Sequence, residues 1–404
     1  MEILFSPPFI DIDVINSVNE SLISGWITTG PKVRQLETAV SELISLKNVL
    51  CVNSATSGLM LTLKWFGVGI GDEVIVPAYT YAATALAVYH LGATPVIVDI
   101  KDDLTIDPEA IAKAITPKTK AVIPVDIAGY PADNDAIKMI LSRSEIVKQF
   151  NPKNKKQELL GRILFLSDAA HSLGAKYKGF PMGHAADLTV FSFHAVKNIT
   201  TAEGGAIALN LPDSFDQEKE YKEMRLMSLN GQTKDAYTKT KAGSWKYDIV
   251  LGGLKVNMPD VLAAIGLAQI RKYKNILLPE RKRVAKTYEK LLKPYSWAIL
   301  PKLENGDTET SYHIYPLRIK NINEDKRDMI IEEISRHKVA VNVHFIPLPM
   351  LSFFKQLGYS IENYPNAYKN YSCEISLPIY PQLDDSMVQI VVETLINAYN
   401  KVIL

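Results

Sequence analysis

The sequence contains little of what marks a secreted, metal-binding or membrane protein. Only two cysteines, Cys51 and Cys373, occur in 404 residues, too few for a disulfide framework or a zinc knuckle, and in keeping with a reducing compartment. No spacing of His, Cys, Asp or Glu indicates a metal site. No apolar run reaches about eighteen residues, so we expect no membrane span, and the N-terminal MEILFSPPFIDID lacks the pattern of a signal peptide. We therefore predict a cytoplasmic protein.

The chain also lacks an excess of charge of either sign. Its 45 basic and 44 acidic residues leave a formal net charge of +1, which offers no broad attraction for nucleic acid or anionic lipid but permits a local basic pocket. The apolar fraction of 47% and the charged fraction of 22% are typical of a globular protein. At this length we expect two domains, or one large domain with an appendage.

Short apolar runs alternate with helical stretches over the first 210 residues. The helical stretches lie at 57–68, 81–92 and 108–115, which is the order of an α/β domain. Because the runs are apolar throughout, they predict strands buried on both faces, hence a mostly parallel sheet covered by helices. The runs cover 48–53, 73–78, 94–100, 120–127, 162–168, 187–193 and 206–210.

The pattern changes near residue 258. A largely helical stretch with a break or helix start at Pro279 is followed by two strand-like segments, and helices are expected around 324–337 and 384–400. We predict a large α/β domain over 1–258, then a linking helix and a smaller α+β domain over 259–404. The polar segment 141–160 is interpreted as a surface excursion without chemistry. The helical stretch covers 259–294 and the strand-like segments 312–319 and 339–345.

Polar side chains follow four of the apolar runs. In an open α/β sheet, ligands bind at the carboxyl ends of the strands, so these side chains are expected to face one cleft. They are Asn53 to Thr56, Tyr79 to Tyr81, Asp168 with His171, and His194 with Lys197.

Each of these features has a plainer explanation when it is taken alone. The Ser54-Ala55-Thr56 segment suits a phosphate at a helix N-terminus, but Ser and Thr also cap helices routinely. Asp168 could balance a buried cation or cap a helix, and Tyr81 could stack on a planar ring or lie in the core. Single histidines such as His171 and His194 are more often structural, and most lysines are solvated.

Together the four features match the needs of pyridoxal 5'-phosphate (PLP). This cofactor requires an anchored phosphate, a sandwiched ring, an acid partner for the pyridine nitrogen and a lysine that forms a Schiff base. Lys197 must then be neutral for part of the time, which desolvation or a nearby cation would favour by lowering its pKa.

The block FSFHAVKNITTAEGGAI (191–207) identifies the family that the chain resembles. With SGWITTGPKVRQLE (24–37) and SLPIYPQL (376–383), it resembles the DegT/DnrJ/EryC1/StrS family of PLP-dependent sugar aminotransferases, of fold-type I. The resemblance runs nearly end to end. It is strongest to members that aminate 4-keto nucleotide sugars, among them the UDP-4-amino-4-deoxy-L-arabinose–oxoglutarate aminotransferases.

The resemblance implies a role for each matching residue. Lys197 would hold PLP covalently and move the proton, Asp168 would pair with the pyridine nitrogen, and Tyr81 would stack on the ring. His171 would lie near the ring's hydroxyl. The phosphate would be bound by Ala55, Thr56 and Ser192, and by Asn257 of the partner subunit.

The resemblance also implies the partners of the enzyme. They would be glutamate or 2-oxoglutarate and a nucleotide-diphosphate keto sugar, bound at active sites shared across a homodimer. Because the donor and the sugar nucleotide are both anionic, local basic contacts are expected. The candidates are Arg225, Lys255, His313 and His344, for each of which a structural role is an equal alternative.

Three departures from the family pattern leave the identity of the sugar open. Asp126 and Asn230 stand where many members have His, and the insertion at 141–160 is longer than usual. A branch of the family carries His in place of the Schiff-base lysine and catalyses dehydration, and Lys197 argues against that branch. The alternatives are another PLP-dependent reaction and a catalytically idle relative that retains the fold.

Overall fold

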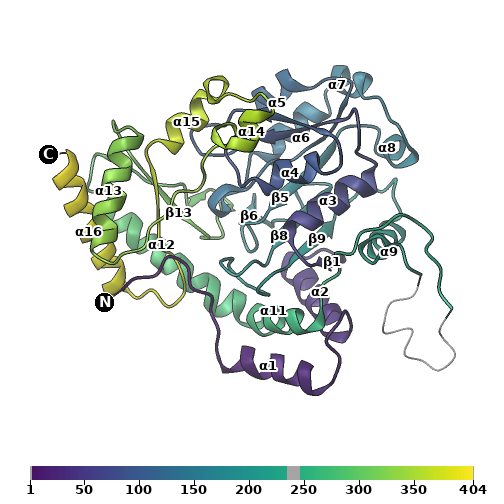
Figure 1. Ribbon diagram of the computed structural model, residues 1–404, viewed down its shortest axis with the longest axis horizontal. Helices are drawn as coiled ribbons and strands as arrows, with labels where there is room; N and C mark the ends of the chain where they lie inside the picture. Colours follow the sequence, from purple (N-terminus) through teal and green to yellow (C-terminus); the bar gives the residue numbers. More distant parts are fainter. Residues whose placement is uncertain (1, 234–245, 404) are drawn as a thin grey trace.

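The computed structural model describes residues 2–233 and 246–403, and its centre is a seven-stranded sheet (Figure 1). The spatial order is β1-β9-β8-β5-β4-β2-β3. The strands are β1 (Asn48–Val52), β2 (Glu73–Pro77), β3 (Thr94–Val98), β4 (Thr119–Val122), β5 (Leu164–Ala169), β8 (Leu188–Ser192) and β9 (Gly205–Leu209). Each of the seven apolar runs thus forms a strand, with ends within five residues of the predicted ones.

Only β9 runs against the other six strands of this sheet. The pairs β2–β3, β2–β4, β4–β5 and β5–β8 are parallel, whereas β9 is antiparallel to both β8 and β1. Strand β9 returns beside β8 with Ser192 opposite Gly205, so the loop between them lies at the carboxyl edge of the sheet. This loop carries Lys197. The prediction of a mostly parallel sheet is confirmed.

Helices cover both faces of the sheet, as the alternation of side chains along β1 shows. Leu50 and Val52 belong to the core formed with α3 (Ala55–Phe66), whereas Val49 and Cys51 pack with α2 (Pro31–Ile44) and α11 (Asp260–Lys272). Because successive strand residues point to opposite faces, a strand covered on both faces must be apolar throughout. The other helices of this part are α1 (Ile12–Ile23), α4 (Ala83–Tyr89), α5 (Pro108–Ala114), α6 (Asn134–Leu141) and α9 (Gln217–Ser228).

A second, smaller core surrounds a three-stranded antiparallel sheet. Its order is β10-β13-β14, and α12, α13 and α16 pack on it (Figure 1). Pro279 lies in the first turn of α12, directly after a π-helical turn at Tyr273–Leu277. The elements are β10 (Ala298–Ile299), β13 (Tyr315–Ile319), β14 (Glu374–Leu377), α12 (Leu278–Leu292), α13 (Glu324–Arg336) and α16 (Asp385–Ile403).

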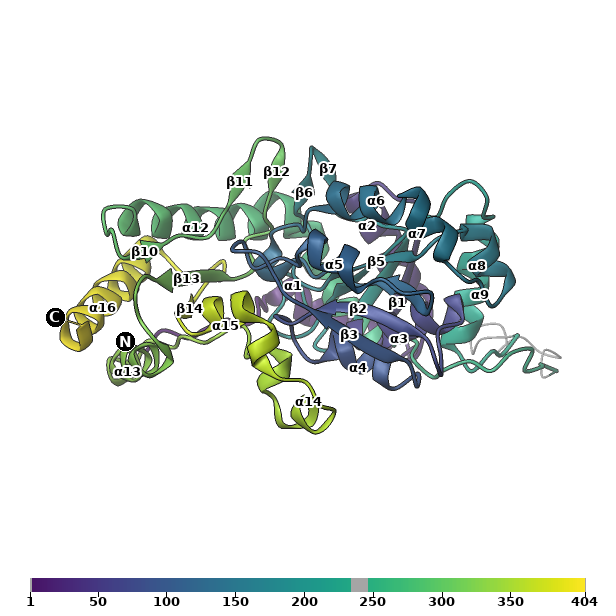
Figure 2. The same cartoon turned by 90° about the horizontal axis from the view of Figure 1, so that it is seen from above.

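A small four-stranded sheet bridges the two parts. The hairpin β11–β12 (Glu304–Asn305 and Thr308–Glu309) lies beside the hairpin β6–β7 (Lys176–Tyr177 and Phe180–Pro181), as Figure 2 shows. The pairing runs through Glu309 and Lys176. The smaller part is therefore joined to the larger one at a second place besides α11 and α12.

Two segments cross the predicted division at residue 258. Ile3 packs in the smaller core and pairs with Val339. Helices α14 (Ser352–Gln356) and α15 (Pro365–Tyr371) do the reverse, because Phe354 and Tyr371 belong to the large core. Neither crossing follows from local sequence pattern.

The expectation of a strand at 339–345 was wrong. The segment 339–345 forms isolated bridges at Val339 and Asn342 in place of a strand, because its backbone turns from β14 into the cleft. The excursion at 141–160 forms α7 (Ser144–Gln149) and α8 (Lys155–Leu160), and Gln157 is fully buried with its amide donating to the Phe66 carbonyl at 3.0 Å. Within the described ranges, no helix combines the length and apolarity that a membrane crossing needs.

Asp99 attaches α15 to the end of β3. Its carboxylate accepts hydrogen bonds from the N–H groups of Asn366 and Ala367, each at 2.9 Å, and so caps a helix from about 267 residues away in sequence. Removing a capping acceptor costs about 1–2 kcal/mol. We expect Asp99→Ala to lower the free energy of unfolding by that amount, measured from the urea midpoint. Asp99→Asn, which keeps one acceptor, should lose less, and an unchanged midpoint in Asp99→Ala would contradict the attachment.

Candidate active site

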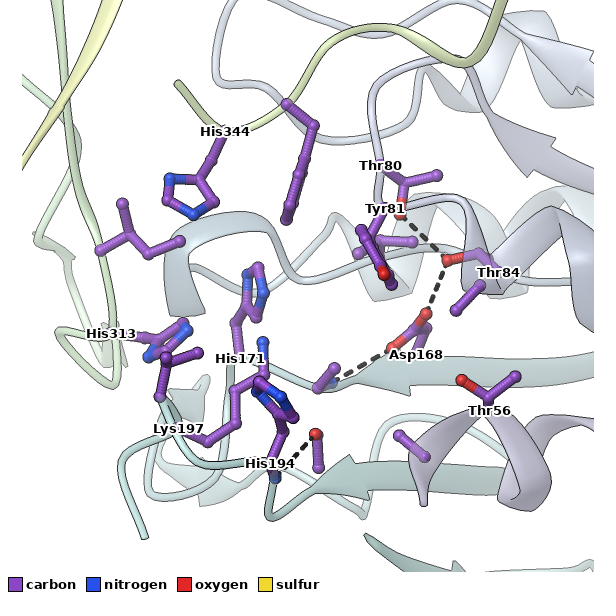
Figure 3. Close-up of a pocket in the computed structure, with 18 of the residues that line it drawn as sticks. Thr56, Thr80, Tyr81, Thr84, Asp168, His171, His194, Lys197, His313 and His344 are labelled. Carbon is purple, nitrogen blue, oxygen red and sulfur yellow. Dashed lines mark hydrogen bonds between the residues drawn. The ribbon is translucent and has the colours of Figure 1, made fainter. Parts of the chain in front are cut away.

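A cavity of about 410 Å³ opens at the carboxyl ends of β1, β2, β5 and β8. This volume is in the range of small-molecule sites. Residues from every predicted strand end line it, and residues of the smaller part close its other side (Figure 3). The cavity brings together nine of the predicted residues, namely Ala55, Thr56, Tyr81, Asp168, His171, Ser192, Lys197, His313 and His344.

Lys197 lies in the loop between β8 and β9. The loop is held by its own backbone, since the Lys197 N–H donates to His194 at 2.9 Å and Thr201 N–H donates to Phe193 at 2.8 Å. Burial lowers the pKa of the Lys197 amine to about 8, while the nearby Asp168 carboxylate opposes that shift. A useful fraction of the amine is therefore neutral and nucleophilic near neutral pH.

Asp168 is buried at the end of β5. Its carboxylate accepts from the Thr84 hydroxyl at 2.8 Å and from the Ala170 N–H at 3.2 Å. Burial raises the pKa of Asp168, and the bonds from Thr84 and Ala170 and the charge of Lys197 act in the opposite direction. An oriented, desolvated carboxylate of this kind is suited to pair with a cation bound in the cavity. Its bond to Ala170 shows that it also orders the following turn.

The N-terminus of α3 forms an anion cradle. Ser54 caps the helix by accepting from Ser57 N–H at 3.0 Å, so the backbone donors of Ala55 and Thr56 are available to a ligand. Gly205 of β9 packs against them, because a Cβ there would lie 2.7 Å from the Ala55 nitrogen. Capping and anion binding are thus compatible, with Ser54 serving the first and Ala55 and Thr56 the second.

His171 and His313 lie side by side beside Lys197, with ring centroids 4.5 Å apart (Figure 3). The Nδ1 atom of His171 accepts from the Ala128 N–H at 3.2 Å, so its proton is on Nε2. Burial lowers the pKa of both imidazoles well below the ordinary value, and neighbouring positive charge adds to the shift. Both rings are consequently neutral at pH 7.

Asn198 determines the tautomer of His313. Its amide NH₂ donates to the Ser311 carbonyl at 2.7 Å, which leaves its oxygen facing the His313 Nδ1 at 2.9 Å. His313 must therefore carry its proton on Nδ1 and present a lone pair on Nε2. His171 and His313 accordingly offer a donor and an acceptor next to each other.

Tyr81 lies at the mouth of the cavity and not in the core. Its side chain is 64% exposed, and its ring lies 5.9 Å from that of Phe345. This exposure removes the core alternative for Tyr81, because a free aromatic face beside a cavity can cover a planar ligand.

Arg225 does not reach the cavity. Its guanidinium pairs with the buried Glu37 carboxylate at 2.5 Å, and Glu37 in turn accepts from the Cys51 N–H at 3.0 Å. The expectation of a substrate contact from within the same chain was wrong, since this ion pair ties α9 to α2 and β1. The signal that misled was the charge alone, which does not distinguish a substrate contact from a structural ion pair.

Lys255 and Asn257 line a separate, open groove. The Lys255 amine donates to Asn257 at 2.7 Å, and the Asn257 amide donates to Thr29 at 2.6 Å. Ser54 and Glu203 contribute to both this groove and the cavity, so the groove adjoins the anion cradle.

The two polar departures from the family pattern lie outside the cavity. Asp126 is fully buried and accepts from Ala132 N–H at 2.9 Å and from the Ser172 hydroxyl at 2.6 Å. It thereby supports the turn that presents Ala128 to His171. Asn230 adopts a left-handed backbone conformation (φ 57°) in a turn. Neither residue is among those that line the cavity.

Several lining residues were not predicted. Thr84 is three residues beyond Tyr81 and orients Asp168, a relation that a helix spacing could have suggested. Phe5 and Phe345 reach the cavity from the N-terminal segment and the smaller part. No local signal marks either residue. Among the described residues, no group of three or more His, Cys, Asp or Glu side chains is arranged to hold a metal ion.

The residues present fit PLP. An anion cradle that a Cβ at Gly205 would obstruct, a buried carboxylate and a partly neutral lysine face one cavity, in a large α/β domain with a small C-terminal partner. This combination defines the active site of a fold-type I PLP-dependent enzyme. Lys197 would hold the aldehyde carbon of PLP, and Asp168 would pair with its ring nitrogen. The anion cradle would hold its phosphate.

Comparison with known families gives the same class. The model of the DegT/DnrJ/EryC1/StrS aminotransferase family matches residues 8–149 and 157–396. The chain belongs to this family and is a PLP-dependent aminotransferase. The internal residues left unmatched, 150–156, lie within the predicted insertion.

Individual relatives are similar over their full length. The spore coat polysaccharide biosynthesis protein SpsC of Bacillus subtilis is 35% identical over 96% of this chain and 95% of its own length. Spr1654 of Streptococcus pneumoniae, assigned as a sugar aminotransferase and solved in its PLP form, is 41% identical with a TM-score of 0.95, and all of both chains is covered. PseC of Helicobacter pylori, an aminotransferase involved in the biosynthesis of pseudoaminic acid, is 28% identical with a TM-score of 0.84, covering 99% of this chain and 100% of PseC.

The lowered pKa of Lys197 predicts an early titration of its amine. In the cofactor-free protein, reductive methylation of Lys197 followed by peptide mass spectrometry should reach half of its maximum near pH 8, against about 10.4 for an ordinary lysine. Asp168→Asn should move the midpoint to lower pH, because the Asp168 carboxylate stabilises the ammonium form. A midpoint shared with the surface lysines would show that Lys197 is solvated.

The cradle predicts that a single methyl group at residue 205 weakens cofactor binding. We expect Gly205→Ala to bind PLP roughly tenfold or more weakly, because the added Cβ crowds the Ala55 nitrogen and overpacking of this kind costs about 1–3 kcal/mol. The matched control is Gly252→Ala, where a Cβ meets nothing within 4 Å. PLP titration by fluorescence measures both, with far-UV circular dichroism to confirm folding. Equal affinities would place the phosphate elsewhere.

Proposed function

We propose that this enzyme transfers the amino group of glutamate to a keto group, at C4, of a nucleotide-linked sugar. The product would serve the biosynthesis of a cell-surface polysaccharide or lipid, and the enzyme would act in the cytoplasm as a homodimer. The observation that carries the proposal is the partly neutral Lys197 amine facing the buried Asp168 carboxylate beside an anion cradle. The sugar as substrate class is supported by Spr1654, PseC and SpsC, whose names concern sugar or polysaccharide metabolism.

The chain's own residues divide the chemistry between them. When bound, PLP supplies an electron sink for carbon–hydrogen bond cleavage next to the amino group. The neutral Lys197 amine removes and returns that proton, and Asp168, held by Thr84, keeps a positive charge on the cofactor ring. His171 presents its Nε2–H to the cavity, where it can donate to an oxygen of the bound cofactor.

A shared active site accounts for Asn257 and Lys255. Both line the open groove next to the anion cradle, and α1 leaves apolar side chains exposed, Ile12 by 64% and Ile23 by 86%. Exposed apolar surface of this kind is typical of an interface. In a homodimer, the groove would meet the partner's cavity and add the Lys255 cation and the Asn257 amide to a site that already contains Lys197, Asp168 and several imidazoles.

Two alternatives remain distinguishable by simple chemistry. A PLP enzyme that dehydrates or decarboxylates would not pass the amino group of glutamate to its cofactor. Burying a lysine amine lowers the free energy of unfolding. An idle relative would gain no catalysis in return for that loss.

The first test follows the half-reaction with glutamate. Adding glutamate to the wild-type holoenzyme should abolish the visible absorption band of lysine-bound PLP and release 2-oxoglutarate, and a panel of 4-keto and 3-keto nucleotide sugars should then restore it. Lys197→Ala should abolish turnover, and Asp168→Ala should lower kcat by roughly 10²-fold or more. A spectrum unchanged by glutamate would rule out this donor, and turnover by reconstituted Lys197→Ala would rule out the mechanism.

A further inference from the structure

A chain of three polar side chains leads from the smaller core to the cavity. The Ser376 hydroxyl donates to the Glu374 carboxylate at 2.5 Å, and the Nδ1 atom of His344 lies 2.9 Å from the same Ser376 oxygen. The other Glu374 oxygen accepts from the His344 N–H at 3.0 Å. His344 itself lines the cavity together with Lys197 (Figure 3).

Strand β14 positions this chain. Glu374 and Ser376 are two residues apart, so their side chains lie on the same face of the strand, and both are fully buried. Ser376 also exchanges backbone hydrogen bonds with Asn342 at 2.7 and 3.1 Å, which places His344 next to the strand. The ring of Phe5 stacks on the imidazole, 5.4 Å between centroids.

The groups around Glu374 do not neutralise it by direct contact. Arg327 donates to the Glu374 backbone oxygen at 3.3 Å and not to the carboxylate. Arg318 acts on the Glu374 carboxylate through its charge alone. Burial raises the pKa of Tyr79 and of Cys373, and the Glu374 charge adds to both shifts. Among the described residues, no ion pair reaches the Glu374 carboxylate. On the cavity side, the titratable groups that face His344 are Lys197, His171 and His313.

The three side chains Glu374, Ser376 and His344 can hold their protons in two arrangements, which use the same two hydrogen bonds in opposite directions. In the first, Glu374 is ionised, Ser376 donates to it, and His344 donates from Nδ1 to Ser376, which leaves a lone pair on His344 Nε2. In the second, Glu374 is protonated and donates to Ser376, Ser376 donates to Nδ1, and His344 carries its proton on Nε2. A proton added at Nε2 converts the first into the second by moving one proton along each hydrogen bond, and His344 is neutral in both.

We propose that Glu374, Ser376 and His344 form a proton store for the amino-transfer reaction. His344 takes up, at Nε2, the proton that the ammonium group of the amino donor must lose, and Glu374 holds it. The same path returns the proton to the keto oxygen of the acceptor, which leaves as water with this proton and one lost by the attacking amino group. His344 is the residue that contacts the substrate, and Ser376 and Glu374 act through it. The inference rests on the proposed aminotransfer to a ketone, because only that reaction expels the oxygen.

The charge states of the two end groups agree with this assignment. Burial raises the pKa of Glu374 to about 8, against the hydrogen bonds from Ser376 and His344 and the charges of the two arginines. Burial, together with the charge of Lys197, lowers the pKa of His344 to about 4. A proton that enters the chain is therefore held by the carboxyl group and not by the imidazole. Uptake from the donor starts from the molecules in which Glu374 is ionised, and their fraction grows as pH rises toward 8.

The test that does not depend on activity is the tautomer of His344. In substrate-free holoenzyme labelled with ¹⁵N-histidine, long-range ¹H–¹⁵N spectra report which ring nitrogen carries the proton, and the loss of one of seven histidine signals in His344→Gln gives the assignment. We expect a switch from the Nε2–H to the Nδ1–H form as pH rises through about 8, without an imidazolium stage. In Glu374→Gln, the amide oxygen must face the His344 N–H, which needs an acceptor, so the amide NH₂ faces Ser376 and donates to it. This variant should remain in the Nε2–H form at every pH. A tautomer that does not respond to pH in the wild type would overturn the proposal.

Kinetics test whether the store is used. Glu374→Gln and Ser376→Ala should each lower kcat by roughly 10²-fold with PLP affinity unchanged. Each should also remove the contribution of Glu374 to the pH dependence of kcat and leave that of Lys197, whose pKa is also about 8. Ser372→Ala is the matched control, since Ser372 is also buried and its hydroxyl, among the described residues, donates to the Lys369 carbonyl and not to a titratable group. Wild-type kcat and pH profile in Glu374→Gln would overturn the proposal even if the tautomer switches. If wild-type enzyme aminates no keto sugar, the proposed function fails instead, and the tautomer measurement is unaffected.

Discussion

The chemistry of this protein depends on removing an amine and a carboxylate from water within one cavity. Lys197 and Asp168 each pay a desolvation cost that shifts their pKa values toward one another, the amine downward and the acid upward. Their mutual attraction opposes both shifts, because each charge stabilises the charged form of the other group. The hydrogen bonds from Thr84 and Ala170 keep Asp168 oriented and compensate part of the cost of burying it.

One reversed strand brings the remaining parts of the site together. Because β9 runs antiparallel to β8 and β1, its first residue, Gly205, lies at the carboxyl edge where β1 ends and α3 begins. The connecting loop from β8 must cross the same edge, and it carries Lys197. A parallel strand at this position would have begun at the opposite edge, away from α3, so the reversal places Gly205 beside the anion cradle and close to the loop that carries the reactive amine.

Buried carboxylates serve three distinct ends in this fold. Asp168 faces the cavity directly, Asp126 holds the turn that fixes the His171 tautomer, and Glu374 reaches the cavity only through Ser376 and His344. Each accepts hydrogen bonds from a hydroxyl and a backbone N–H, which is how a buried carboxyl group is accommodated without an ion pair. The three carboxylates differ in their route to the cavity. Among these three, the hydroxyl bonded to Glu374, that of Ser376, also contacts a cavity-lining imidazole, that of His344.

The sequence by itself determined the sheet, the order of its strands in the chain and the residues at the strand ends. Apolar runs buried on both faces and polar residues at their carboxyl ends are local properties, and the block around Lys197 carries the family. Only the tertiary structure decided which residues meet across long separations. It paired Arg225 with Glu37, packed α14 and α15 on the large core, and brought Phe5, His313 and His344 to the cavity. These contacts depend on side-chain packing between distant segments, for which no periodicity or spacing in the chain exists.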